Sequence, residues 1–150
     1  MIDRRQVTKA LLALTPAATG LPCGDGAAPV GGVEPPYYVL YALHATYSGA
    51  PFADLHEDAS LVYQWTCVSG PDKTRPGSRG SRDQAEWMAD KVRRALLGRD
   101  RTTGAWLHPL TVPGAHCTGR SLDTEPGGRN EPADAIMGYD VRIRFDLTAA

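Results

Sequence analysis

The side chains that could carry chemistry are few in this sequence, and they do not gather at the spacings that catalysis or metal binding needs. His56, Glu57 and Asp58 stand next to one another. Consecutive residues of an extended chain point to opposite sides, so three adjacent side chains rarely converge on one ion or one substrate. We therefore expect a solvated turn here; the alternative is a small enzyme whose site uses this triplet.

The other histidines and cysteines also lack the pattern of a metal or redox site. His108, His116 and Cys117 do not have ligand spacing. The three cysteines, which include Cys23 and Cys67, are widely spaced and form no Cys-x-x-Cys unit, so we expect reduced thiols. No paired carboxylates, nucleophile–base pair or cofactor loop emerges either. The sequence therefore predicts no catalytic residue, no metal and no cofactor, and a protein that is not an enzyme.

The composition sets limits on the function. The chain has 150 residues, which suits one domain (residues 1–150) with its own hydrophobic core, and its formal net charge is −1. Without a basic excess, it is not expected to bind nucleic acid or an anionic membrane by bulk electrostatics. It has no apolar run near the roughly 18 residues of a membrane span, so we expect no membrane partner. Sixteen glycines and twelve prolines predict long loops.

The elements that must position any site begin with an amphipathic helix between Ser81 and Gly98. Ser81 is the predicted N-cap, Gln84 the second half of a capping box, and Gly98 a left-handed C-cap. Apolar side chains recur on one face at the spacing of a helix. These residues are Ala85, Met88, Ala89, Val92, Ala95 and Leu96. We expect this face to pack on the core.

The same helix carries a second stripe roughly opposite the first, formed by Trp87, Asp90, Arg94 and Leu97. In one interpretation the core simply extends further round the helix, or the tryptophan is partly exposed. In the other, an Asp90–Arg94 ion pair at i,i+4 spacing frames Trp87 and Leu97 as anchors of a subunit interface, because Trp and Arg are enriched among interface hot spots. The sequence leaves both interpretations open.

The remaining pattern predicts an α+β fold, with a mostly antiparallel sheet of about four strands, two helices packed on one face, and long Gly/Pro-rich loops. The expected elements, in order, are a helix over residues 3–15 that Pro16 ends, a loop over 19–36, a central strand over 37–43 covered on both faces, a strand over 60–68, the helix above, short strands over 106–112 and near 116–120, a loop over 124–135, and a strand over 139–148.

Basic side chains gather in two places. Lys73, Arg75 and Arg79 lie in a loop before the helix, and Arg142 and Arg144 lie on the polar face of the last strand, which alternates strictly between apolar and polar residues. Each group is either ordinary solvated surface or a face presented to a charged partner, such as a neighbouring subunit or passing DNA.

Several segments together resemble the small tail terminator proteins of long-tailed (siphovirus-type) phages of actinobacteria. The resembling segments are Val7-Thr-Lys-Ala-Leu-Leu-Ala-Leu14, Gly20-Leu-Pro22, Pro36-Tyr-Tyr-Val-Leu-Tyr41, His56-Glu-Asp-Ala-Ser-Leu-Val-Tyr-Gln64, Arg82-Asp-Gln-Ala-Glu-Trp-Met-Ala-Asp-Lys-Val-Arg-Arg-Ala-Leu-Leu97 and the last strand. They cover most of the chain in the family's order, and they are motifs of the fold rather than catalytic signatures.

The resemblance implies a virion structural protein that forms a homo-hexameric ring on the head-proximal end of the tail. Such a ring stops polymerisation of the tail tube protein and offers a docking face to the head–tail connector, with DNA only passing through its lumen. It is located in the virion tail, and in the host cytoplasm during assembly. The alternative in the same virion is a head-completion or stopper protein.

A ring needs two different sticky patches on each chain. From periodicity we expect ring contacts from the second stripe of the helix, and a lumen or adjoining-ring role for the basic residues. The first set is Trp87, Asp90, Arg94 and Leu97, and the second is Lys73, Arg75, Arg79, Arg142 and Arg144.

Overall fold

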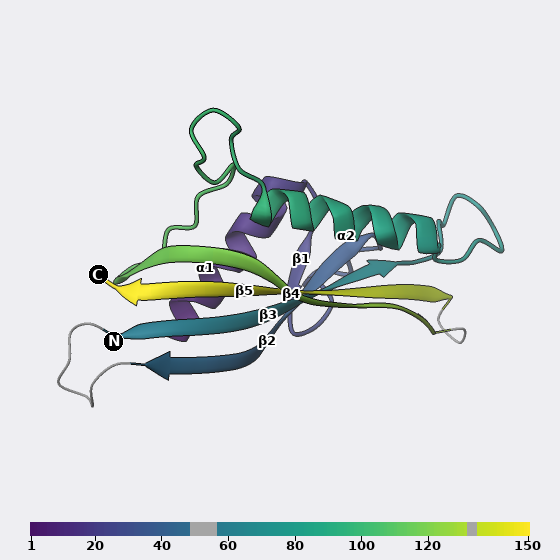
Figure 1. The fold of residues 1–150 in the computed structure, drawn as a ribbon. Helices are drawn as coiled ribbons and strands as arrows, with labels where there is room; N and C mark the ends of the chain where they lie inside the picture. The colour runs from purple at the N-terminus through teal and green to yellow at the C-terminus, as the bar shows by residue number, and fades with distance from the viewer. Residues whose placement is uncertain (49–56, 132–134) are drawn as a thin grey trace.

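The computed structural model describes residues 1–48, 57–131 and 135–150, and folds them into two helices and one five-stranded sheet (Figure 1). The elements are α1 (Arg4–Thr19), β1 (Cys23–Asp25), β2 (Tyr37–Ser48), β3 (Asp58–Ser69), α2 (Arg82–Leu97), β4 (Ala115–Glu131) and β5 (Ile136–Ala149). The strand order is β1-β2-β3-β5-β4, and every neighbouring pair is antiparallel except β1 with β2. The predicted fold class is confirmed, with five strands in place of about four.

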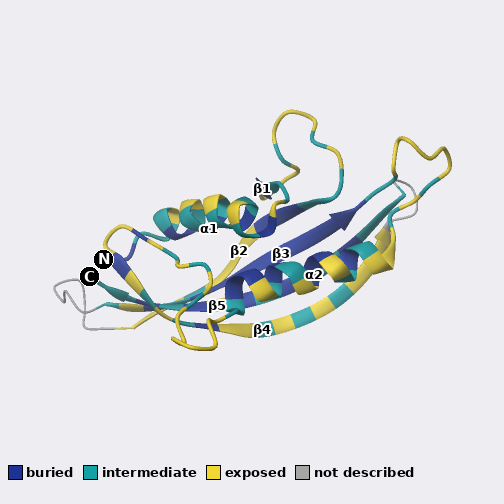
Figure 2. Ribbon diagram, turned by 90° about the horizontal axis from the view of Figure 1, so that it is seen from above, coloured by how far each residue is buried: buried dark blue, intermediate teal, exposed yellow. Residues whose placement is uncertain are grey.

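Both helices lie on the same face of the sheet, as the view in Figure 2 shows. Alternate residues of β3 and β5 face them, which is the pattern of a half-covered sheet. These residues are Leu61, Tyr63, Trp65, Cys67, Val141, Ile143, Phe145 and Leu147, all 0–1% exposed. They form one core with Val7 and Leu11 of α1 and with the apolar face of α2. We call the other side of the sheet, without helices, the open face.

Helix α1 is longer than predicted, because Pro16 lies inside it rather than at its end. Proline removes one backbone donor from a helix interior, and here Thr15 and Thr19 add hydroxyl bonds to the carbonyls one turn before them, at 2.8 and 2.6 Å. Gly20 ends the helix in the left-handed conformation, at φ 76°, and its N–H donates to the Pro16 carbonyl at 2.8 Å.

Helix α2 has the predicted bounds, and its caps are only partly as predicted. Ser81 is the N-cap, and its hydroxyl accepts from the Gln84 N–H at 3.0 Å. The return bond of a capping box is absent from its usual place, because the Ser81 N–H donates to the Ser69 hydroxyl of β3, which itself donates to the Gln84 side chain. Gly98 is extended, at φ −68°, so the predicted left-handed C-cap is wrong. Glycine fits there because a Cβ would overlap the Arg94 carbonyl oxygen.

Three predictions about strands need correction. The structure places a short strand, β1, in the predicted 19–36 loop, and it extends β4 through most of the predicted 124–135 loop. In β4, Pro126 and several glycines are accommodated by shifts of register at an edge strand. The predicted strand at 106–112 is reduced to two isolated bridges, Arg99 with Trp106 and Val112 with Ala115.

Strand β2 was expected to be the central strand covered on both faces, and that prediction is wrong. Strand β3 occupies the centre of the sheet and is buried on both faces along most of its length. In β2 only Tyr38, Val39 and Leu40 are buried. A continuous apolar run indicates burial on both faces, but here the helices cover only the first part of the strand.

Candidate functional site

The outer side of α2 carries an aromatic and cationic groove. Trp87 is 49% exposed and Leu107, in the segment after the helix, is 52% exposed. The Lys91 ammonium lies 5.0 Å from the centroid of the Trp87 ring, a cation–π contact. The groove has a volume of about 390 Å³, and its lining residues are Ala18, Trp87, Asp90, Lys91, Arg94, Ala95, Leu107 and His108. We call it the α2 groove.

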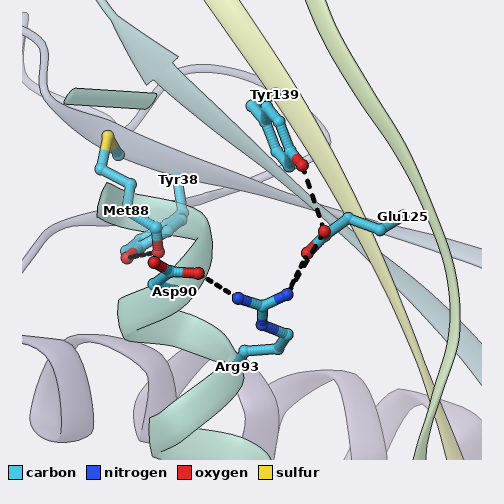
Figure 3. Close-up of polar contacts among 6 residues, drawn as sticks. All are labelled: Tyr38, Met88, Asp90, Arg93, Glu125 and Tyr139. Atoms are coloured by element: carbon cyan, nitrogen blue, oxygen red, sulfur yellow. Dashed lines mark hydrogen bonds and ion pairs between the residues drawn. The ribbon is translucent and has the colours of Figure 1, made fainter. Parts of the chain in front are cut away.

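Asp90, the one carboxylate among the described residues that line the α2 groove, is already paired. Asp90 forms an ion pair with Arg93, so the Asp90–Arg94 pair of the second interpretation is not the one that forms. Figure 3 shows the reason: the Arg93 guanidinium also binds Glu125 of β4 at 3.0 Å, and Glu125 accepts from the Tyr139 hydroxyl of β5 at 3.1 Å. This chain of contacts turns Arg93 toward the sheet and ties α2 to β4 and β5.

The groove therefore keeps an unbalanced positive charge. Among the residues that the structure describes, Lys91 and Arg94 have no ion pair, and His108 stands beside them. Leu97, the fourth residue of the predicted interface set, is not part of the groove; it is half-buried against the core. The structure thus brings Trp87, Asp90 and Arg94 together and places Leu97 elsewhere.

The segment after α2, which presents Leu107 to the groove, is held by a cluster that the sequence did not reveal. The Arg99 guanidinium lies 3.8 Å from the centroid of Trp106, and that of Arg120 lies 4.7 Å from it. Arg120 also donates to the Leu96 carbonyl at 3.0 Å, at the end of α2, and its burial lowers the pKa of the guanidinium. These contacts fix the segment that presents Leu107.

The three basic residues of the loop before α2 differ in their pairing. Lys73 lies 2.8 Å from Glu34, and Arg75 lies 3.9 Å from Asp72. In the described parts of the chain no ion pair is found for Arg79, which is exposed. Much of the loop's charge is thus balanced locally.

Arg142 and Arg144 of β5 lie on the open face, as the alternation predicts. Arg144 forms an ion pair with Asp123 of β4 at 2.8 Å, whereas Arg142 donates to the neutral Gln64 side chain at 2.9 Å. Gln64 begins a polar network on this face. The Gln64 amide donates to the Thr66 hydroxyl, which donates to Asp140 at 2.7 Å.

The structure also exposes a surface that sequence reasoning missed, over residues 41–48, which we call the outer half of β2. Tyr41, Leu43 and Tyr47 are 36%, 42% and 45% exposed. Strand β1 pairs only with Tyr38, Val39 and Leu40, so among the described residues no strand pairs with the outer side of this half. Figure 2 shows the outer half of β2 as an exposed strip beyond the helices.

The candidate chemical residues do not form a site in the described residues. His56 lies outside them. Glu57 accepts the Ile2 N–H at 2.6 Å, and Asp58 begins β3, so this part of the predicted turn belongs to the fold. Within residues 1–48, 57–131 and 135–150 no three metal-binding side chains come together, and no helix is long and apolar enough to cross a bilayer.

Neither comparison with known proteins adds an assignment: no family model matches this chain, and no curated protein matches it.

Proposed function

We propose that this chain is a structural protein of a phage tail, which assembles into a hexameric ring on the head-proximal end of the tail tube. The ring stops addition of tube subunits and gives the head–tail connector its docking face. The observation that carries the proposal is the α2 groove, where a half-exposed tryptophan lies on the outer side of α2 beside two cations that have no ion pair among the described residues.

The chemistry of the groove suits a protein contact better than a substrate site. Trp and Arg are enriched at interface hot spots, where an aromatic anchor becomes buried and water is excluded from nearby charges. The groove offers Trp87 and Leu107 for burial and Lys91 and Arg94 for a partner's carboxylates. Its described lining residues include no nucleophile–base pair, and Asp90 is occupied by Arg93.

Ring closure further requires that each chain present two unlike surfaces. The α2 groove is aromatic and cationic, whereas the open face carries a polar network and largely paired charges. The two lie on opposite sides of the sheet, so one copy can present the first while its neighbour presents the second.

Within this proposal the basic residues serve the lumen or the adjoining ring. Arg79 and Arg142 are the strongest candidates, since no described carboxylate balances either of them. The positive electrostatic potential is increased less by Lys73, Arg75 and Arg144, because each has a carboxylate within 4.0 Å. Passing DNA then meets isolated cations rather than a strongly basic surface, which favours sliding over tight binding.

The experiment is a tube-capping assay. The tail tube protein of the virus that encodes this chain is polymerised with and without the purified chain, and tube lengths are measured by electron microscopy. The proposal expects tubes that stop growing and carry a ring at one end. Tubes that grow to the same lengths with and without the chain would contradict it.

A further inference from the structure

We infer that the outer half of β2 pairs antiparallel, across a two-fold axis, with the same segment of a second copy of this chain. This contact joins two five-stranded sheets edge to edge. It goes beyond the ring contact proposed above, because it uses the edge backbone of β2, which lies outside the α2 groove, although Leu43 and His44 border the open face beside Arg142 and Arg144.

The first argument is the unpaired backbone. Strand β2 is 12 residues long and β1 only 3, and β1 pairs with Tyr38, Val39 and Leu40 alone. The rest of β2 presents its outer N–H and C=O groups without a strand partner in the described chain. At about 3.3 Å per residue, this edge is roughly 26 Å long, ample for strand addition.

The second argument is the exposure of the side chains. Every residue in 41–48 is exposed except Ala45, which is half-buried, so neither helix covers this half of the strand. Tyr41 and Leu43 offer apolar surface on a strand whose outer edge, in the described parts of the chain, has no strand partner. A long, apolar and open strand edge is a template for pairing with another chain.

The third argument is a contrast between the two edges of the sheet. Strand β4 has the features that protect an edge, namely three shifts of register, a proline and charged side chains such as Asp123 and Glu125. The outer half of β2 has one shift of register and no Lys, Arg, Asp or Glu. Protection on one edge and its absence on the other mark β2 as the edge that binds a partner.

The absence of charge favours a second copy of the same segment as the occupant. In an antiparallel contact across a two-fold axis, each residue meets a residue of the same segment, so like charges would repel. An uncharged segment avoids this repulsion. Pairing with β4 of a second copy would instead bring a strand that carries Asp123 and Glu125 against the uncharged segment, where burial of a carboxylate is costly.

The test is sedimentation velocity of the full chain over a range of concentrations, in a Trp87→Ala background that weakens the proposed ring contact. We expect this chain to sediment as a dimer. Leu43→Lys and His44→Lys should raise the dimer Kd at least tenfold, with unchanged circular dichroism. The matched control is Leu122→Lys, at a residue that is 43% exposed on β4, and it should leave the dimer intact.

A mixing experiment tests the two-fold axis itself. His44 lies near the middle of the segment, so His44→Lys and His44→Glu should each be monomeric alone and should form a mixed dimer when combined. If the Trp87→Ala chain sediments as a monomer at every concentration measured, the inference is overturned. Dimers that persist in Leu43→Lys and His44→Lys would also overturn it. The same holds if the mixture of His44→Lys and His44→Glu stays monomeric and Leu122→Lys also breaks the dimer. If the wild type forms no ring but the dimer persists, the proposed function fails and this inference stands.

Discussion

The Trp65 indole N–H donates to the Thr15 hydroxyl at 3.0 Å, and this bond joins the middle of the sheet to the last turns of α1. Both side chains are 0% exposed, and the Thr15 hydroxyl in turn donates to the Leu11 carbonyl at 2.8 Å. A buried N–H that loses its acceptor cannot turn to water instead. The bond therefore fixes how α1 sits on the sheet.

Replacing Thr15 by valine should lower the free energy of unfolding by about 1–3 kcal/mol, because it leaves the Trp65 N–H buried and unpaired. Thr15→Ser is the matched control, since it keeps the hydroxyl and removes only a methyl group, at a cost of about 0.8 kcal/mol. Urea unfolding followed by tryptophan fluorescence measures both. Equal stability of Thr15→Val and wild type would show that the bond does not stabilise the fold.

The ion pair between Arg93 and Glu125 should contribute more than an ordinary surface pair. Their side chains are 34% and 22% exposed, and Glu125 is also held by Tyr139. A double-mutant cycle with alanine at both positions should give a coupling free energy of about 1 kcal/mol.

The pair Arg82–Glu86, on the exposed face of α2, is the comparison for that cycle, and its coupling should be about 0.3–0.5 kcal/mol or less. A coupling for Arg93–Glu125 no greater than for Arg82–Glu86 would remove the argument that this contact ties α2 to the sheet.

The fold should lose stability in mild alkali. Burial raises the pKa of the Cys23 thiol to about 12, and it also raises the pKa of Cys67. An unfolded cysteine titrates near pKa 8.5, so above that pH the unfolded state releases protons that the folded state keeps. The stabilisation is therefore complete below about pH 8.5 and is lost as the pH rises toward the folded pKa, by up to about 1.4 kcal/mol per pH unit for each thiol.

Urea unfolding of the reduced protein between pH 7 and 10 measures this loss. In Cys23→Ala the free energy of unfolding should fall less steeply with pH than in wild type, because the contribution of one thiol to the slope is removed. Parallel curves for the two proteins would mean that Cys23 ionises alike in the folded and unfolded states.

Trp87→Ala should weaken the proposed ring association by about 2 kcal/mol or more while the single chain stays folded, because the side chain is half-exposed and lies outside the core. Arg94→Ala should also weaken it, and Arg101→Ala, an exposed arginine away from the groove, is the matched control. The mass of the assembled protein measures association and circular dichroism checks the fold. A Trp87→Ala chain that assembles as wild type does would remove this residue from the interface.

Local sequence patterns predicted the elements that have clear capping residues or a regular spacing of apolar residues. The cap at Ser81 and the apolar spacing of α2 gave its bounds, and strict alternation identified β5. Strand β1 escaped prediction because three residues that include Gly24 show no period. Pro16 is a helix breaker in the sequence, but α1 continues past it. The hydroxyl bonds of Thr15 and Thr19 to the preceding turn, which accompany this continuation, could not be inferred from the sequence.

The candidate site was predictable only as far as one helix defines it. Periodicity placed Trp87, Asp90 and Arg94 on a common side of α2, but i,i+3 and i,i+4 neighbours are equally near on a helix. The choice of Arg93 as the partner of Asp90 depends on Glu125, which comes from β4. The exposure of the outer half of β2 likewise depends on where the helices end on the sheet, which is set by tertiary packing.

The most direct measurement is electron microscopy of particles assembled in host cells that lack this protein. If this chain is the protein that ends tube growth, cells without it should contain overlong tubes of variable length that carry no heads, and the proposed function predicts that result. Tails of normal length lying beside unjoined, leaking heads would contradict it. The chain would then act on the head side as a stopper, and Arg79 and Arg142 would have to be explained as part of a gate that retains DNA.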